Sequence, residues 1–199
     1  MKKNLLISIL MTIVTTVLLG VIYPLVVTGL AQIFFKDKAN GQLIVQNGQV
    51  IGSRIIGQAF TGPSYFHSRP SAAGNGYDAA NSNGSQLGPT NHQLVDRVKA
   101  SVADAQADNP GQPVPVDLVT ASASGLDPDI TPAAAEFQLQ RVAKERGATV
   151  EQLQQLIAKH TLGRQFGFLG EPRVNVLELN LELDRQFPMR KQAEVGPPR

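Results

Sequence analysis

The most pronounced hydrophobic pattern in the chain is the uncharged stretch Asn4–Phe35, directly behind two lysines. At about 1.5 Å per residue, a helix over this stretch is longer than the roughly 30 Å hydrocarbon core of a bilayer. A secretory signal peptide would have a shorter apolar region and a small-residue cleavage site, which the sequence around Ala31 does not provide. We therefore predict a membrane anchor over residues 1–35, with a single span at about 7–30 that Pro24 kinks or ends.

The charges on either side of the span do not decide its orientation. Lys2 and Lys3 precede it, and Lys36 and Lys38 follow it, so the positive-inside rule gives little preference. A long C-terminal domain crosses a membrane largely regardless of its own charge. We therefore favour a single-pass membrane protein with its N-terminus inside and its domain outside.

Beyond the anchor, the pattern predicts one soluble α+β domain over residues 36–188, with a β-hairpin, a small sheet and several helices. Asn47-Gly48 between two β-branched runs is a strong hairpin signal. Residues 55–60 either continue the second strand or form a short helical turn. Apolar residues between prolines at 113–119 predict an extended segment, confined to a sheet edge because proline cannot donate to a ladder.

Helical spacing of apolar residues predicts three helices in this domain. The first covers about 91–107, behind a capping box that begins at Thr90. The second follows Thr131, a natural N-cap with proline next to it, and ends at Gly147. The third follows a second capping box at Thr149.

The C-terminal part of the domain is ambiguous in its pattern. Leucines in residues 174–187 alternate as in a strand, but Asn175 begins a capping pattern, and we favour a helix. Residues 189–199 are rich in proline and charge, and we predict a disordered tail.

A long loop over residues 61–89 separates the hairpin from the first helix. It is crowded with Gly, Asn, Ser and Pro, yet it carries Tyr65, Phe66, Arg69 and Tyr77. Loops of this length are usually functional or disordered. Three interpretations remain open: a docking surface, a loop pinned to its own core, and a linker.

Composition excludes one large class of partners. The chain has 18 Lys+Arg and 16 Asp+Glu, and two of those lysines precede the span, so the soluble part is formally neutral. Without a basic stripe to neutralise phosphates, nucleic-acid binding is not expected. The chain has no cysteine, which is compatible with an oxidising compartment but does not establish one.

Catalytic and metal-binding motifs are weak. Serines, histidines and aspartates for a hydrolase triad exist, but no G-x-S-x-G elbow does. These candidates are Ser122, Ser124, His67, His92, His160, Asp127 and Asp129. We expect the two aspartates to cap the following helix instead. The isolated histidines predict no metal site, and the glycine-rich segment 163–170 lacks a phosphate-loop ending, so we interpret it as a turn-rich connector.

Five blocks of sequence, in order, carry a resemblance to a known family. They are Tyr65–Ser71, Tyr77–Ala80, Ser82–Asn91, Ala121–Ile130, and the segment from His160 to Gly163-Arg164 and Leu169–Val176. Together with the N-terminal span, these blocks resemble the C subunit of the Kdp-type potassium-transporting ATPase. The similarity runs nearly end to end and stops at about Phe187.

This resemblance implies a noncatalytic accessory subunit of an ATP-driven, high-affinity potassium import complex. Such a complex lies in the bacterial inner (plasma) membrane, which would place the N-terminus in the cytoplasm and the domain on the periplasmic or extracellular side. The implied partners are a potassium-selective channel-like subunit, a P-type ATPase subunit and a small membrane peptide. The resemblance also implies a role as a catalytic chaperone that raises the ATP affinity of the ATPase subunit, with ATP bound in a ternary complex. No bound cofactor is otherwise expected, and an outward-facing domain would not meet cytoplasmic ATP.

We therefore predict that the domain caps the outer entrance of the channel-like subunit, with the aromatic loop as a docking surface. The candidate docking residues are Tyr65, Phe66, His67, Arg69, Tyr77, Arg164, Glu171 and Arg173. The last three could instead pair within their own segment. The alternative function is a membrane-anchored periplasmic hydrolase or cell-wall-binding domain.

Overall fold

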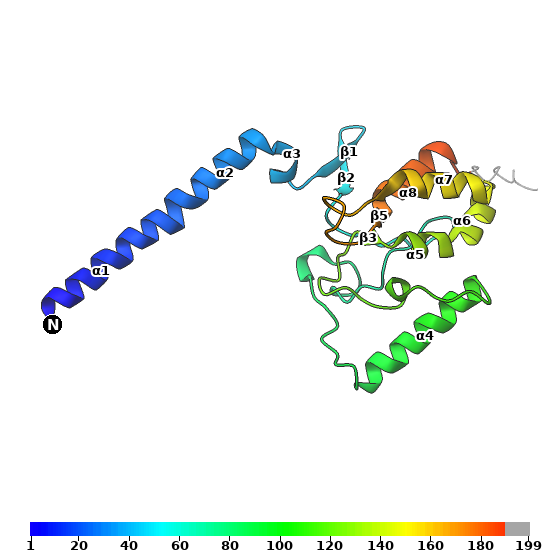
Figure 1. Cartoon of the computed structure of the whole chain (residues 1–199), viewed down its shortest axis with the longest axis horizontal. Coiled ribbons are helices and arrows are strands. Elements are labelled where there is room, and N and C mark those ends of the chain that lie inside the picture. The colour runs from blue at the N-terminus through cyan, green and yellow to red at the C-terminus, as the bar shows by residue number, and fades with distance from the viewer. Residues whose placement is uncertain (190–199) are drawn as a thin grey trace, which may run out of the picture. The chain divides into compact units, whose positions relative to one another are not determined.

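The computed structural model describes residues 1–189, and these fall into two compact units (Figure 1). The first unit is Met1–Ser53, and the second begins at Arg54. The boundary lies after the β-hairpin, whereas the sequence placed the hairpin within the domain that starts at residue 36. Most of the predicted disordered tail, residues 190–199, lies outside the described residues.

An apolar helix dominates the first unit. It comprises α1 (Lys2–Val17), a π-helical turn η1 (Leu18–Ile22) and α2 (Tyr23–Phe34). By length and composition it is sufficient to cross a membrane. Pro24 does not end the helix. The wider π turn immediately before Pro24 accommodates a residue that lacks an N–H and would crowd the preceding turn of an α-helix.

The rest of the first unit is a short helix and the expected hairpin. The apolar helix ends at Phe34, and α3 (Lys36–Ala39) follows after Phe35. Strands β1 (Leu43–Gln46) and β2 (Gln49–Ser53) pair in antiparallel fashion around Asn47-Gly48. Both turn residues have positive φ, 52° and 77°, which is the geometry that Asn-Gly favours. The hairpin prediction is confirmed.

The second unit contains a three-stranded antiparallel sheet in the order β3-β5-β4. Its strands are short: β3 (Asp129–Ile130), β4 (Thr161–Leu162) and β5 (Arg173–Asn175). Val174 in β5 pairs with Ile130 on one side and Thr161 on the other. Four helices pack with this sheet, and the chain is of the predicted α+β class.

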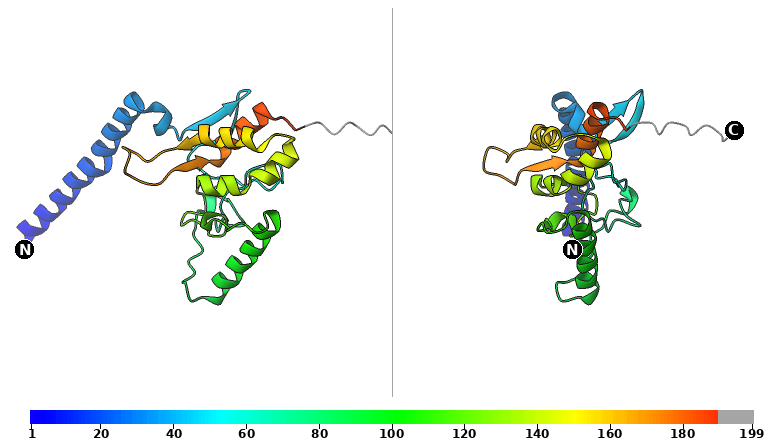
Figure 2. Two further views of the ribbon diagram at one scale, coloured as in Figure 1. Left: turned by 45° about the vertical axis from the view of Figure 1, so that its right-hand side comes forward. Right: turned by 90° about the vertical axis from the view of Figure 1, so that its right-hand side faces the viewer.

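The four packed helices lie next to one another in Figure 1. They are α5 (Pro132–Phe137), α6 (Leu139–Arg146), α7 (Val150–His160) and α8 (Val176–Gln186). Helix α4 (His92–Asp108) stands apart from them in Figures 1 and 2 and has no fully buried residue. Two 3-10 turns, η2 (Ala79–Asn81) and η3 (Val116–Leu118), complete the described elements of this unit.

The helix boundaries follow the predicted capping chemistry with two differences. Thr131 and Thr149 accept bonds from the N–H groups of Ala134 and Gln152, and Gly147 ends α6 with a left-handed φ of 64°. The helix expected from Thr131 to Gly147 is interrupted at Gln138, which separates α5 from α6. The N-cap of α4 is Asn91 rather than Thr90.

Two further expectations about local structure are corrected. The extended strand at 113–119 is wrong, because the segment forms η3, which starts immediately after Pro115. Residues 55–60 neither extend β2 nor form a helix; they are turn and irregular backbone. Residues 174–187 are mainly helical, as favoured, but Val174 and Asn175 belong to β5 and the Asn175 side chain caps α8.

The core of the second unit is formed by α5–α8, the sheet and one residue of the long loop. Phe66 from this loop is fully buried, among side chains that include Leu153, Leu179 and Val174. Two buried side-chain amides hold it in place. The Asn180 side chain accepts from the N–H of Phe66 and donates to its C=O, each at 2.9 Å.

The adjacent residue is held in the same way. Gln138 Oε1 accepts from the N–H of His67 at 2.7 Å, and its Nε2 donates to the His67 carbonyl at 3.1 Å. Both amides therefore act as substitutes for a neighbouring strand, and they satisfy backbone groups that are costly to bury unpaired.

The substitution Asn180→Leu should strongly destabilise the chain. It leaves the N–H and C=O of buried Phe66 without partners, at a cost of about 1–3 kcal/mol for each group. The free energy of unfolding, measured by denaturant titration in detergent, tests this. Gln154→Leu, on an exposed position of α7, is the matched control and should change stability little. Equal stability of the two variants would contradict the role of Asn180.

Candidate functional site

The eight residues predicted for docking fall into three places in the second unit. Tyr65, Phe66 and His67 lie along the helices α6 and α8. Arg69 and Tyr77 form a cluster with the segment around Asp127. Arg164 and Glu171 belong to the connection between β4 and β5, and Arg173 is the first residue of β5.

Tyr65 takes part in a network of internal contacts. Its hydroxyl donates to Asp184 Oδ2 at 3.2 Å, and the guanidinium of Arg146 lies 4.6 Å from the centre of its ring. Arg146, whose side chain is fully buried, also forms an ion pair with Asp184 at 2.7 Å. Its Nε donates to the carbonyl of Ser64. These contacts join the loop to α6 and α8, as the pinned-loop interpretation predicts.

His67 lies at the edge of a pocket of about 390 Å³ that α4 lines from the other side. Its Nε2 lies 2.9 Å from the carbonyl of Gly62, which fits a donating Nε2–H. Burial lowers the pKa of the imidazole below its ordinary value of 6.5, and nearby Arg141 acts in the same direction. The bond to Gly62 and the charge of Asp108 oppose this shift. His67 is therefore favoured in its neutral form.

Arg69 and Tyr77 hold two distant segments of the chain together. Arg69 forms an ion pair with Asp127 at 2.9 Å, and the Tyr77 hydroxyl donates to the Arg69 carbonyl. Ser71 donates to the carbonyl of Gly125 at 2.6 Å and accepts from the N–H of Tyr77 at 2.8 Å. Burial raises the pKa of Tyr77, which keeps its hydroxyl as a donor.

Two glycines allow this close approach. Gly125 has a φ of 67°, and a Cβ there would lie 2.7 Å from the N–H nitrogen of Ala73. A Cβ at Gly57 would lie 2.5 Å from the carbonyl oxygen of Asp127. Real Cβ atoms do not approach backbone atoms this closely, so these positions require glycine.

A charged pocket of about 270 Å³ lies beside this cluster, and it brings together three of the predicted residues. It is lined by Arg69, Glu171 and Arg173, together with Asp117, Asp127, Asp129, Ile130, Thr131 and Pro172. Charges of opposite sign alternate around it: Arg69 pairs with Asp127, and Arg173 pairs with Asp129 at 3.0 Å. Burial raises the pKa of Asp129, and the charge of Arg173 offsets part of the shift.

The expectation that Asp127 and Asp129 cap the next helix is wrong. Thr131 caps α5, and both aspartates are ion-paired with arginines that lie far away in the sequence. A third carboxylate, Asp117, accepts from both the N–H and the hydroxyl of Thr131. No signal in the sequence indicated which arginine meets which aspartate.

The β4–β5 connection is the turn-rich segment that the sequence predicted. Arg164 and Glu171 form an ion pair at 2.6 Å across it, so they pair within their own segment. Gln165 and Leu169 form an isolated antiparallel bridge at its end. Figure 2 shows this connection extending away from the helices of the unit.

The described residues do not assemble the hydrolase triad that the inventory allowed. The hydroxyl of Ser122 accepts from the N–H of Gly125, and the hydroxyl of Ser124 accepts from the N–H of Leu126. His92 is exposed at the start of α4, and Asp127 pairs with Arg69. Within residues 1–189, no group of three or more His, Asp or Glu side chains is placed to hold a metal ion.

Comparison with known proteins identifies the family. The family model described as "K+-transporting ATPase, c chain" matches residues 5–185, from the first turn of the apolar helix to α8. The chain belongs to this family, KdpC. The resemblance carried by the five sequence blocks is thus confirmed, and by family the chain is an accessory subunit rather than an enzyme in its own right.

Similar proteins support the family over nearly the whole chain. A protein of Koribacter versatilis named "Potassium-transporting ATPase KdpC subunit" is 71% identical over 189 residues, covering 95% of this chain and 98% of its own length. A protein of the same name from Acidobacterium capsulatum is 61% identical, covering 89% and 96%. One from Rhodospirillum rubrum is 58% identical, covering 87% and 91%.

His67 gives a pH dependence that can be measured. Because its pKa is lower in the folded chain than in the unfolded chain, the unfolded chain binds more protons below about pH 6.5. His67 should therefore reduce stability as the pH falls from about 7.5 to about 5, by at most about 1.4 kcal/mol per pH unit.

The matched variant for this prediction is His67→Gln, whose amide can still donate to the Gly62 carbonyl. Unfolding free energies of both proteins across this pH range give the difference. The stability of the variant should rise relative to wild type as the pH falls. A difference that does not depend on pH would contradict the burial of a neutral His67.

Proposed function

We propose that this KdpC chain is a noncatalytic subunit that stabilises an ATP-driven, high-affinity potassium import complex. The observation that carries the proposal is the family match, which includes both the apolar helix and the second unit. Relatives named as potassium-transporting ATPase subunits support it over nearly their full lengths. The proposed partners are the channel-like subunit, the P-type ATPase subunit and the small membrane peptide.

The arrangement of polar groups agrees with an assembly role. Side chains that a catalytic site would use are engaged in internal pairs, such as Arg69 with Asp127 and Arg173 with Asp129. The sequence also contains no Asp-Lys-Thr-Gly motif for phosphorylation by ATP. ATP hydrolysis is therefore assigned to a partner.

The candidate docking residues differ in what they can offer a partner. Phe66 is fully buried, so any effect of its substitution would act through the fold. The side chains of Arg164, Glu171 and Arg173 are 44%, 72% and 37% exposed, and these three remain available for contact. We propose that these three charged side chains, rather than Phe66, meet the channel-like subunit near its outer entrance.

Deletion of the chain should abolish potassium uptake at micromolar external potassium, because the complex would not assemble. Affinity purification of the full-length chain from detergent should also recover a P-type ATPase subunit. Re-expression of the wild-type chain is the control. Normal uptake after deletion, with the chain recovered alone, would favour the anchored hydrolase or wall-binding domain.

Orientation determines whether the chain can affect ATP directly. With the N-terminus in the cytoplasm, the second unit faces away from ATP, and a catalytic-chaperone effect on ATP affinity would have to pass through the membrane part of the complex. With the opposite orientation, a ternary complex with ATP becomes possible. The first arrangement is the one we propose.

Single cysteines can test the orientation, because the natural chain has none. Val116→Cys, at a position 71% exposed in the second unit, should react with a membrane-impermeant maleimide in spheroplasts. Lys3→Cys, on the other side of the span, should react only after lysis. The reverse pattern would place the second unit inside and support direct contact with nucleotide.

A further inference from the structure

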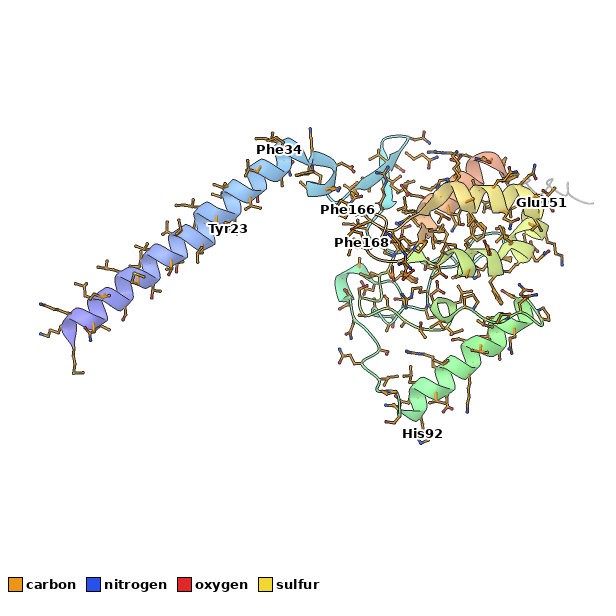
Figure 3. All side chains as sticks on the ribbon, viewed as in Figure 1. Tyr23, Phe34, His92, Glu151, Phe166 and Phe168 are labelled. Carbon is orange, nitrogen blue, oxygen red and sulfur yellow. The ribbon has the colours of Figure 1, made fainter. Side chains whose placement is uncertain are left out.

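The β4–β5 connection presents an apolar tip, which consists of Phe166, Phe168 and Leu169. These side chains are 87%, 70% and 47% exposed, in a unit whose other described phenylalanines include the fully buried Phe66. Figure 3 labels both exposed rings at this tip. Adjacent apolar side chains this exposed mark a contact with another surface.

The backbone conformation at the tip does not favour a phenylalanine at position 166. Phe166 and Gly167 have φ of 53° and 82°, nearly the same as Asn47 and Gly48 in the first hairpin. This geometry favours Asn at the first position and disfavours a bulky ring. The tip therefore keeps a phenylalanine where asparagine would serve the fold better.

Four backbone N–H groups of the β4–β5 connection are paired within it. The N–H groups of Gln165, Gly167, Phe168 and Leu169 all donate to carbonyls of residues 164–169. The charged side chains between Gly163 and Pro172 are Arg164 and Glu171, and they neutralise each other. The apolar tip itself carries no charged residue, so it can enter an apolar environment without leaving these four N–H groups unpaired.

We propose that this apolar tip inserts into the lipid bilayer, at the boundary between headgroups and acyl chains. Residues 35–53 join the apolar helix to the second unit, so the chain itself limits the distance between the end of this helix and the start of the unit to on the order of 60 Å. This tether gives the tip a high effective concentration at the membrane, so weak insertion is enough. Lipid is favoured over a protein partner because the tip, Phe166–Leu169, contains no Tyr, Trp or Arg for directional recognition.

The proposal rests on the membrane anchoring of the chain, but not on its orientation or on potassium transport. The chain has no tryptophan, so Phe168→Trp introduces a single fluorescent reporter at the tip. The full-length variant is reconstituted in phosphatidylcholine vesicles whose acyl chains carry bromine at defined depths. Flotation with the vesicles first verifies that the anchor is inserted.

Bromine close to the headgroups should quench the reporter more than bromine near the chain ends, with emission shifted to the blue. Two matched variants control the result. His92→Trp, at the exposed start of α4 (Figure 3), should not be quenched. Adding Phe166→Asn to the reporter variant should reduce quenching while leaving stability equal or higher, because asparagine suits the left-handed turn position.

Failure of flotation would contradict the anchoring itself. Flotation with an unquenched, water-exposed reporter would overturn the lipid contact alone. A photo-reactive phenylalanine analogue at position 166, used in the assembled complex, distinguishes contact with lipid from contact with another subunit. Adducts with lipid support the proposal, and adducts confined to another subunit would overturn it in favour of a protein interface.

Discussion

Burial of the Phe66 segment between the helices is the constraint on which most of the second unit depends. A loop residue in a helical core brings its backbone N–H and C=O with it, and these groups need partners. Asn180 and Gln138 provide them by using side-chain amides as a strand would use its backbone. The interruption between α5 and α6 at Gln138 belongs to this arrangement, because it is where the loop contacts the helices.

Sequence blocks that identify the family are in direct contact with one another in the fold. Ser71 and Gly125, as well as Arg69 and Asp127, come from different blocks and bond directly to each other. Their close approach requires glycine at 57 and 125. The glycine-rich composition that would suggest a flexible linker therefore produces a tightly bonded region with long-range ion pairs.

In contrast to this internally bonded region, the β4–β5 connection exposes apolar side chains to solvent. Its Arg164 and Glu171 pair with each other, while Phe166 and Phe168 are 87% and 70% exposed. If the tip enters the bilayer as we propose, the chain has two means of attachment to the membrane, the apolar helix and the tip. Such an arrangement would limit the freedom of the second unit relative to the membrane, which agrees with the proposed role in stabilising an assembly.

The sequence by itself determined the local elements and the family. The long uncharged stretch predicted the apolar helix, and Asn47-Gly48 predicted the hairpin. Thr131 and Thr149 predicted two helix starts. Each of these features depends on residues that are close together in the chain. The family followed from the order of five blocks, now supported by the match over residues 5–185.

Tertiary structure decided what local pattern could not. It placed Phe66 in the core, paired Asp127 and Asp129 with Arg69 and Arg173, and left residues 113–119 without a strand partner. An exposed phenylalanine and a buried one look the same in a sequence. Only the packing of distant segments determines which of them remains in contact with solvent, because burial is a property of the surroundings and not of the residue.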